Sequence, residues 1–124
     1  MTRAVFIAAL AAFAFTVSAQ SAQTVKVTLS EWKLQFPSDT LRAGPVTFEV
    51  KNTGTVTHGF HVTGNGIDKG TRDIAKGESA TLTLTLKAGT YEVFCPMSDM
   101  SHKAAGMAGK LIVREADTAP GRSR

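Results

Sequence analysis

Apolar and polar side chains alternate along most of this chain, and a period of two is typical of half-buried β-strands. The alternation first runs over residues 25–36, from Val25 through Trp32 to Phe36, and is interrupted at Pro37. It returns in the segments 46–50, 56–62, 82–86, 91–95 and 110–114. Turn-forming residues separate these segments, and no amphipathic helix of useful length is visible between them. The chain is therefore expected to be all-β.

Seven or eight short strands at this spacing predict two antiparallel sheets packed face to face. Val, Thr, Leu and Phe dominate the strands, and these residues suit pleated surfaces that are buried on one side. The length between the two ends of the pattern allows one domain with a single core, which we place at residues 20–115. The expected architecture is a β-sandwich.

Both ends of the chain are expected to lie outside this domain. Residues 1–19 are interpreted as a cleaved signal peptide: Arg3 supplies the positive start, an apolar stretch runs to Val17, and small residues end at Ala19. The alternative is an uncleaved membrane anchor, but the apolar stretch is shorter than the roughly 20 residues of a spanning helix. Residues 116–124 are polar and are expected to be a disordered tail. The mature protein is thus expected in the periplasm or secreted, with no membrane span.

The charge of the chain argues against one class of partner. Its formal net charge is +4, but the basic residues are scattered and none forms a cluster interleaved with aromatic residues. Nucleic acid is therefore not an expected partner. Nothing in the sequence signals an oligomer, so a monomer with protein partners is expected.

The only cysteine of the chain is Cys95. In an exported protein a single cysteine cannot form an internal disulfide, so it is inert in the core, paired between chains, or a ligand. Cys95 has the same strand phase as Tyr91 and Val93, which directs its side chain inward at the point where Pro96 ends the strand. An exposed thiol would be oxidised in this compartment, and metal binding would prevent that.

Three further candidate ligands accompany the cysteine. His102 and Met107 follow it in one loop, where small residues between them allow the loop to close around an ion. His58 lies far upstream and shares the inward phase of Phe60, whereas His61 has the opposite phase and is expected to face solvent. His58 is therefore the predicted second histidine.

The four side chains offer one thiolate, two imidazoles and one thioether. This combination is the ligand set of a blue-copper electron-transfer site. Zinc is the alternative ion, but its structural sites usually contain more thiolates and its catalytic sites a water, so a methionine argues against it. The expected cofactor is one copper ion that alternates between Cu(I) and Cu(II).

Two segments also resemble a known family. Residues 91–113, which read Tyr-Glu-Val-Phe-Cys-Pro followed after the loop by His-Lys-Ala-Ala-Gly-Met-Ala-Gly-Lys-Leu-Ile-Val, resemble the copper loop and last strand of plastocyanin-like and azurin-like cupredoxins. Lys-Asn-Thr-Gly at 51–54, upstream of His58, is similar to the region of the first histidine ligand. The resemblance covers nearly all of residues 25–114.

The resemblance implies a Greek-key β-sandwich that shuttles single electrons between larger redox proteins. It implies His58, Cys95 and His102 as equatorial ligands and Met107 as the axial ligand. The histidine of the copper loop, here His102, would lie at the surface and serve as the exit for the electron.

The chain departs from the family pattern at two places, and the longer spacer carries two methionines. Six residues separate Cys95 from His102, more than the family commonly has. Gly59 stands where an asparagine often ties the two ligand loops together, so a looser site is expected. Met97 and Met100 in the spacer are interpreted as an apolar rim for docking a partner, or alternatively as extra thioether donors for Cu(I).

Three functions are compatible with these residues. The first is an electron carrier that is not an enzyme, and the alternative is a periplasmic Cu(I) carrier or metallochaperone that uses Met97 and Met100. The third is activation of oxygen or nitric oxide at an open copper position. Catalysis is disfavoured because Met107 is placed to fill that position and Asp99 is the only carboxylate in the loop.

Overall fold

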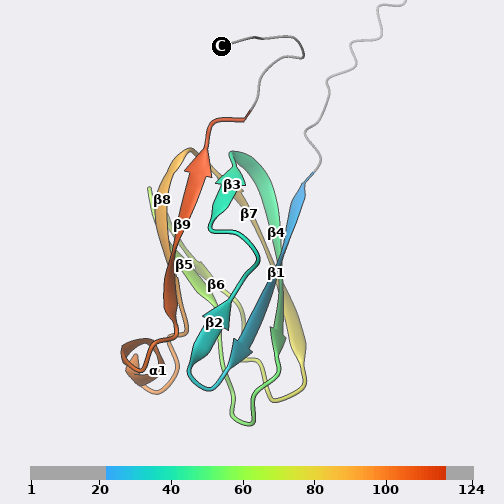
Figure 1. Ribbon diagram of the computed structural model, residues 1–124, viewed down its shortest axis with the longest axis vertical. Helices are drawn as coiled ribbons and strands as arrows, with labels where there is room; N and C mark the ends of the chain where they lie inside the picture. Colours follow the sequence, from blue (N-terminus) through green and yellow to red (C-terminus); the bar gives the residue numbers. More distant parts are fainter. Residues whose placement is uncertain (1–21, 117–124) are drawn as a thin grey trace, which may run out of the picture.

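The computed structural model of the protein describes residues 22–116, and these form a sandwich of two β-sheets (Figure 1). In chain order the elements are β1 (Gln23–Ser30), β2 (Lys33–Gln35), β3 (Thr40–Arg42), β4 (Gly44–Asn52), β5 (His61–Gly64), β6 (Ile67–Gly70), β7 (Ser79–Leu86), β8 (Gly89–Phe94), α1 (Ser101–Ala104) and β9 (Ala108–Arg114). The all-β sandwich is confirmed, with nine strands in this range where seven or eight were expected.

The two sheets have the strand orders β2-β1-β4-β7 and β3-β9-β8-β5-β6. Most neighbouring strands are antiparallel, but β1 pairs with β4 and β3 pairs with β9 in parallel. The expectation of purely antiparallel sheets is therefore wrong at these two pairs. Antiparallel neighbours can be joined by tight hairpins, whereas parallel neighbours need a crossover. Here the chain makes that crossover through β2 and β3 before it enters β4.

The core lies between the sheets and consists of the inward-facing members of the alternating segments. Each of these side chains is at most 9% exposed, and burying one of this size contributes about 1.5–3 kcal/mol. They include Val25, Val27, Leu29, Val46, Phe48, Val50, Leu84, Leu86, Tyr91, Val93, Leu111 and Val113. Most of this core therefore comes from the strands that the alternation predicted.

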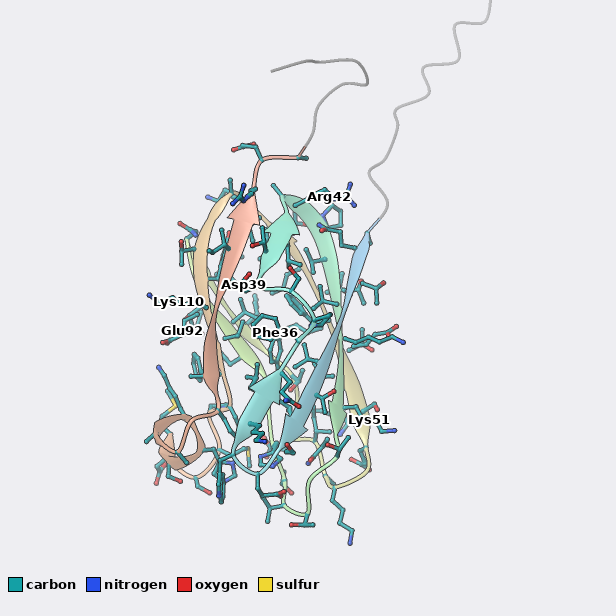
Figure 2. The ribbon with its side chains drawn as sticks, in the orientation of Figure 1. Phe36, Asp39, Arg42, Lys51, Glu92 and Lys110 are labelled. Atoms are coloured by element: carbon teal, nitrogen blue, oxygen red, sulfur yellow. The ribbon has the colours of Figure 1, made fainter. Side chains whose placement is uncertain are left out.

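Phe36 closes the sandwich where β2 and β3 are joined. Figure 2 shows this side chain between β1 and β9, over the middle of the molecule. Its ring atoms lie 3.4 and 3.5 Å from where a Cβ on Gly109 would stand, so the ring packs directly on the backbone of β9. A larger residue at 109 would displace it.

Two of the expected strands are shorter or interrupted. The alternation over 25–36 is not one strand, because β1 ends at Ser30 and the chain reverses so that Ser30 pairs with Lys33. Trp32 lies in this turn and is 46% exposed, not inward. Within 56–62 only the end is strand, and His58 forms a single bridge to Ile74. Alternation reports the phase of a side chain but does not show where a strand turns.

The spacer between β8 and β9 contains the short helix α1. Three successive residues before it have positive φ: Ser98 at 54°, Asp99 at 51° and Met100 at 70°. This left-handed turn absorbs the additional residues of the spacer and leads directly into α1. It lies at the same end of the sandwich as the β1–β2 turn (Figure 1).

The expected signal peptide at 1–19 lies outside the described residues, as does all of the expected tail except residue 116. Within the described range, no helix is long and apolar enough to cross a membrane.

Candidate metal centre

Three segments converge at one end of the sandwich: the β1–β2 turn, residues 53–60 between β4 and β5, and residues 95–107 between β8 and β9 (Figure 1). Cys95 follows the last residue of β8 and is completely buried, as is His58. His102 lies in α1 and is 7% exposed. The potential ligand atoms of these three residues all lie within 4.8 Å of one another.

The donor atoms form a compact triangle. Nδ1 of His58 lies 3.2 Å from Nδ1 of His102, and Cys95 Sγ lies 3.6 Å from His102 Nδ1 and 4.0 Å from His58 Nδ1. A triangle with these sides has a point about 2.1 Å from all three atoms, close to the usual metal–nitrogen and metal–sulfur distances. The donors therefore fit a single metal ion.

Met107 is fully buried, and its backbone lies beside two residues of this triangle. Its backbone oxygen accepts a hydrogen bond from the Cys95 N–H at 3.0 Å, and its own N–H donates to the His102 oxygen at 3.1 Å. The backbone of Met107 is thus bound to both loop residues of the triangle. One thiol, two imidazoles and one thioether together form the donor set of a type 1 copper site.

Gly59 contacts the cysteine through its backbone, although it has no side chain to do so. Its backbone N–H donates to Cys95 Sγ at 3.3 Å and so links the segment of His58 to the cysteine. Gly59 lacks the side chain that often ties the two ligand loops together, and here its backbone N–H connects the two segments.

Asn52 holds the segment that leads to His58, and sequence reasoning missed it. This side chain is fully buried at the end of β4. Its Nδ2 donates to the Val56 oxygen at 2.8 Å and to the Ile74 oxygen at 2.9 Å, and its Oδ1 accepts from the Gly54 N–H at 2.9 Å. A buried polar group with all of these bonds fixes the loop in one conformation.

Glu31 is the second residue that sequence reasoning missed. Its Oε1 accepts hydrogen bonds from the backbone N–H groups of Thr55 at 2.6 Å and Val56 at 2.9 Å, and lies 3.4 Å from Nε2 of His58. The N–H groups of Val56 and Thr55 lower the pKa of this carboxyl from 4.5 to about 2, so it is ionised at neutral pH. The available signal was its phase, because residue 31 continues the inward positions of Val25 and Leu29.

The imidazole of His58 is kept neutral. Burial lowers its pKa, and the nearby imidazole of His102 lowers it further, whereas Glu31 opposes the shift. A neutral imidazole carries a lone pair on one of its nitrogens, which is the form that binds metals.

Trp32 is the third missed residue and covers the site from outside. Its ring lies edge-on to the rings of His102, at 4.9 Å between centroids, and of His58, at 6.4 Å. His102 was expected at the surface, but the β1–β2 turn carries Trp32 across it. At Gly106, where φ is 123°, a Cβ would stand 3.3 Å from the Trp32 oxygen, so the loop passes close beneath this turn.

His61 does not belong to the triangle, and the two methionines of the spacer lie in different surroundings. His61 is hydrogen-bonded through Nε2 to Asp68 and stacks against Phe94 at 5.3 Å between ring centroids, on the opposite side of its strand from the core. Met97 is half-buried and packs against the core, with its sulfur 3.8 Å from where a Cβ on Gly59 would stand. Met100 is exposed.

Comparison with known proteins identifies the family. The sequence family described as the cupredoxin-like domain matches residues 3–113. The chain belongs to this family. A search of curated protein sequences found no significant match to this chain.

Solved structures share its fold at low sequence identity. Reduced auracyanin from the photosynthetic bacterium Roseiflexus castenholzii has a TM-score of 0.63 and 20% identity, over 76% of this chain and 98% of that one. Auracyanin A from Chloroflexus aurantiacus, described as a "blue" copper protein, has a TM-score of 0.60 and 20% identity, over 76% and 100%. A multicopper oxidase has a TM-score of 0.57 and 20% identity, over 76% of this chain but only 42% of its own length.

Proposed function

We propose that the protein binds one copper ion through His58, Cys95, His102 and Met107 and carries single electrons between larger redox proteins. The observation that carries this proposal is the triangle of two Nδ1 atoms and one Sγ, all within 4.8 Å and shielded from solvent. The structural likeness to auracyanin A, a blue copper protein, supports it.

The donor types suit both oxidation states of copper. The bound metal supplies a one-electron couple, with thiolate and thioether favouring Cu(I) and imidazole accepting either state. The protein holds the donors in place: Cys95 is bound through its backbone N–H to Met107 and through its sulfur to Gly59. Side chains fixed in this way change position little when the charge of the site changes, which favours rapid electron exchange.

The same geometry favours a carrier over an enzyme. Glu31 lies at the far nitrogen of His58 and is held there by Thr55 and Val56, so it does not face the donor triangle. Asp99 is exposed in the spacer. Met107 is buried beside the triangle, where it would occupy the fourth coordination position in place of water. The likeness to a multicopper oxidase concerns less than half of that chain.

A Cu(I) carrier is the second candidate. Its support is the position of Met97, which lies half-buried near Gly59, and of Met100, which is exposed on the same spacer. In this function the two thioethers would pass Cu(I) to a partner.

We further propose that the mature chain is a monomer in the periplasm or outside the cell, and that it exchanges electrons with protein partners.

The test is the visible and EPR spectrum of the chain from residue 20 onward after addition of one equivalent of Cu(II). We expect an intense thiolate-to-copper band and a narrow copper hyperfine splitting. Cys95→Ala should abolish both, and His61→Ala, as the matched control, should change neither. A colourless wild-type protein that binds Cu(I) tightly would instead support the carrier.

A further inference from the structure

We infer that Glu31 positions His58 for metal binding: its carboxylate holds the imidazole proton on Nε2, which leaves the lone pair of Nδ1 facing Cys95 and His102. The inference rests on the proposed function only in taking His58 as a ligand. Glu31 does not itself reach the donor triangle, since it lies at the opposite nitrogen of the ring.

The Glu31 carboxylate is held in place by three hydrogen bonds from the segment before His58. One oxygen, Oε1, accepts from the Thr55 N–H at 2.6 Å, the Val56 N–H at 2.9 Å and the Thr55 hydroxyl at 3.2 Å. A Cβ on Gly54 would stand 2.6 Å from both carboxylate oxygens, so a side chain there would displace the carboxylate. Residues 54–56 therefore wrap the carboxylate closely and fix its direction toward His58.

The Nε2 atom of His58 depends on this carboxylate. The atom is completely buried and has no hydrogen-bond partner of normal geometry within the described part of the chain. Oε1 of Glu31 lies 3.4 Å from it, within ion-pair distance, and the attraction between an N–H dipole and an anion is strong in a buried site. A buried N–H without any such partner costs about 1–3 kcal/mol.

The two neutral tautomers of His58 therefore differ in free energy. With the proton on Nε2, the N–H dipole points at the Glu31 carboxylate, and Nδ1 presents its lone pair to the donor triangle. With the proton on Nδ1, a lone pair would face the carboxylate while the proton occupied the position of the metal. The charge on Glu31 disfavours the second arrangement, so the metal-free site is already set for binding.

A structural role alone would also explain part of this arrangement. Glu31 could anchor residues 55 and 56 without influencing the histidine. The two roles differ in one observable, the tautomer of His58, which loop anchoring does not determine. The experiment must therefore read the imidazole and not only the stability of the fold.

The experiment is ¹⁵N NMR of the histidine side chains in the metal-free full chain at a pH above the histidine titrations. The chain has three histidines, so His61→Ala assigns one signal directly and simplifies the rest. In the wild type we expect His58 wholly as the Nε2–H tautomer. Glu31→Gln, whose amide oxygen can still accept from Nε2–H, should keep it, and Glu31→Ala should give a mixture of both tautomers. Glu49→Ala, which removes an exposed carboxylate from β4, is the matched control and should behave as wild type.

A second readout is the affinity for Cu(I), measured by competition with a chelator. Glu31→Ala should weaken binding about 10–100-fold, the usual effect of removing the outer partner of a metal-binding histidine, and Glu49→Ala should have no effect.

Unchanged His58 signals in Glu31→Ala would overturn the inference. If that variant fails to fold, Gly54→Ala, which displaces the carboxylate, must shift the tautomer, and an unshifted tautomer there would equally overturn it. A wild-type protein with the Nε2–H tautomer but no blue spectrum would contradict the proposed function and leave the role of Glu31 supported.

Discussion

Met107 lies fully buried beside Cys95 and His102, so its replacement tests the fourth donor without emptying the core. Met107→Leu conserves the side-chain volume and should change the free energy of unfolding by less than about 1.5 kcal/mol. Copper binding should persist, but the reduction potential should rise, because Cu(I) is stable with three donors, whereas Cu(II) gains more from a fourth, axial donor. Voltammetry of the copper-bound protein measures this. Met100→Leu, on the exposed methionine, is the control, and an equal shift there would show that Met107 is not the axial donor.

Trp32 shields His102, and its removal should open the site. With the indole gone, water and chelators reach the imidazole, and we expect copper to be lost to a competing chelator about tenfold faster in Trp32→Ala. Trp32→Phe keeps an aromatic cover and should retain most of the protection. Stopped-flow absorbance follows the loss. Val56→Ala, which truncates another exposed apolar side chain at this end, should match the wild type; equal rates in all three variants would mean that Trp32 does not shield the metal.

At the scale of single residues, the phase of the alternation correctly distinguished the two histidines that lie upstream of the cysteine. It placed His58 inward and His61 outward, and the structure has them so. The same rule could have drawn attention to Glu31, which continues an inward phase. It could not place Trp32, because a turn residue has no strand phase. Contacts such as that between Glu31 and His58 join residues 27 positions apart, and no local pattern encodes them.

Among the elements, the spacer between β8 and β9 contains a run of residues with left-handed backbone conformation. A left-handed backbone costs an ordinary L-residue about 1–2 kcal/mol, and three such residues occur in succession from Ser98. Ser98→Gly removes that cost but adds about 0.5–1 kcal/mol of backbone entropy to the unfolded chain, so a net gain of about 0.5–1 kcal/mol is expected. Urea denaturation measures it. Ser98→Ala keeps a Cβ and should give no gain; a gain of the same size there would show that the backbone conformation is not the cause.

The length of this spacer was visible in the sequence, but its conformation was not. Six residues separate Cys95 from His102, and nothing in them predicted how the spacer folds. The left-handed turn and α1 take up the excess length, so that His102 Nδ1 lies 3.6 Å from the sulfur. None of the residues at 98–100 is glycine, which is the usual sequence signal for positive φ. The turn therefore has no sequence signal of its own, and it is visible only in the structure.

Over the whole molecule, alternation predicted the sandwich and most of the core but not the strand pairing. Val46, Phe48 and Val50 are buried as expected, because one face of each strand must leave water. Their partners are set by contacts distant in sequence: Val25 lies beside Phe48 in the parallel β1–β4 pair, and Phe48 beside Leu82 in the antiparallel β4–β7 pair. The alternation of a segment is the same for a parallel and an antiparallel neighbour, so the two parallel pairs could not be read from it.

The hydrophobic core between the sheets should be able to fold without the metal centre. The core between the sheets extends well beyond the donor triangle, and backbone hydrogen bonds already hold Cys95 and Met107 in place. The metal-free protein should therefore unfold cooperatively, unlike small domains whose folding requires their metal. Copper at a free concentration of 100 times its dissociation constant should add about 2.7 kcal/mol, which for a domain of this size raises the Tm by roughly 10–20 °C. Differential scanning calorimetry with and without copper measures the shift, and Cys95→Ser, which removes the thiolate but keeps the side-chain size, should lose most of it. A metal-free chain with no cooperative transition would show that the centre, and not the sandwich core, determines folding.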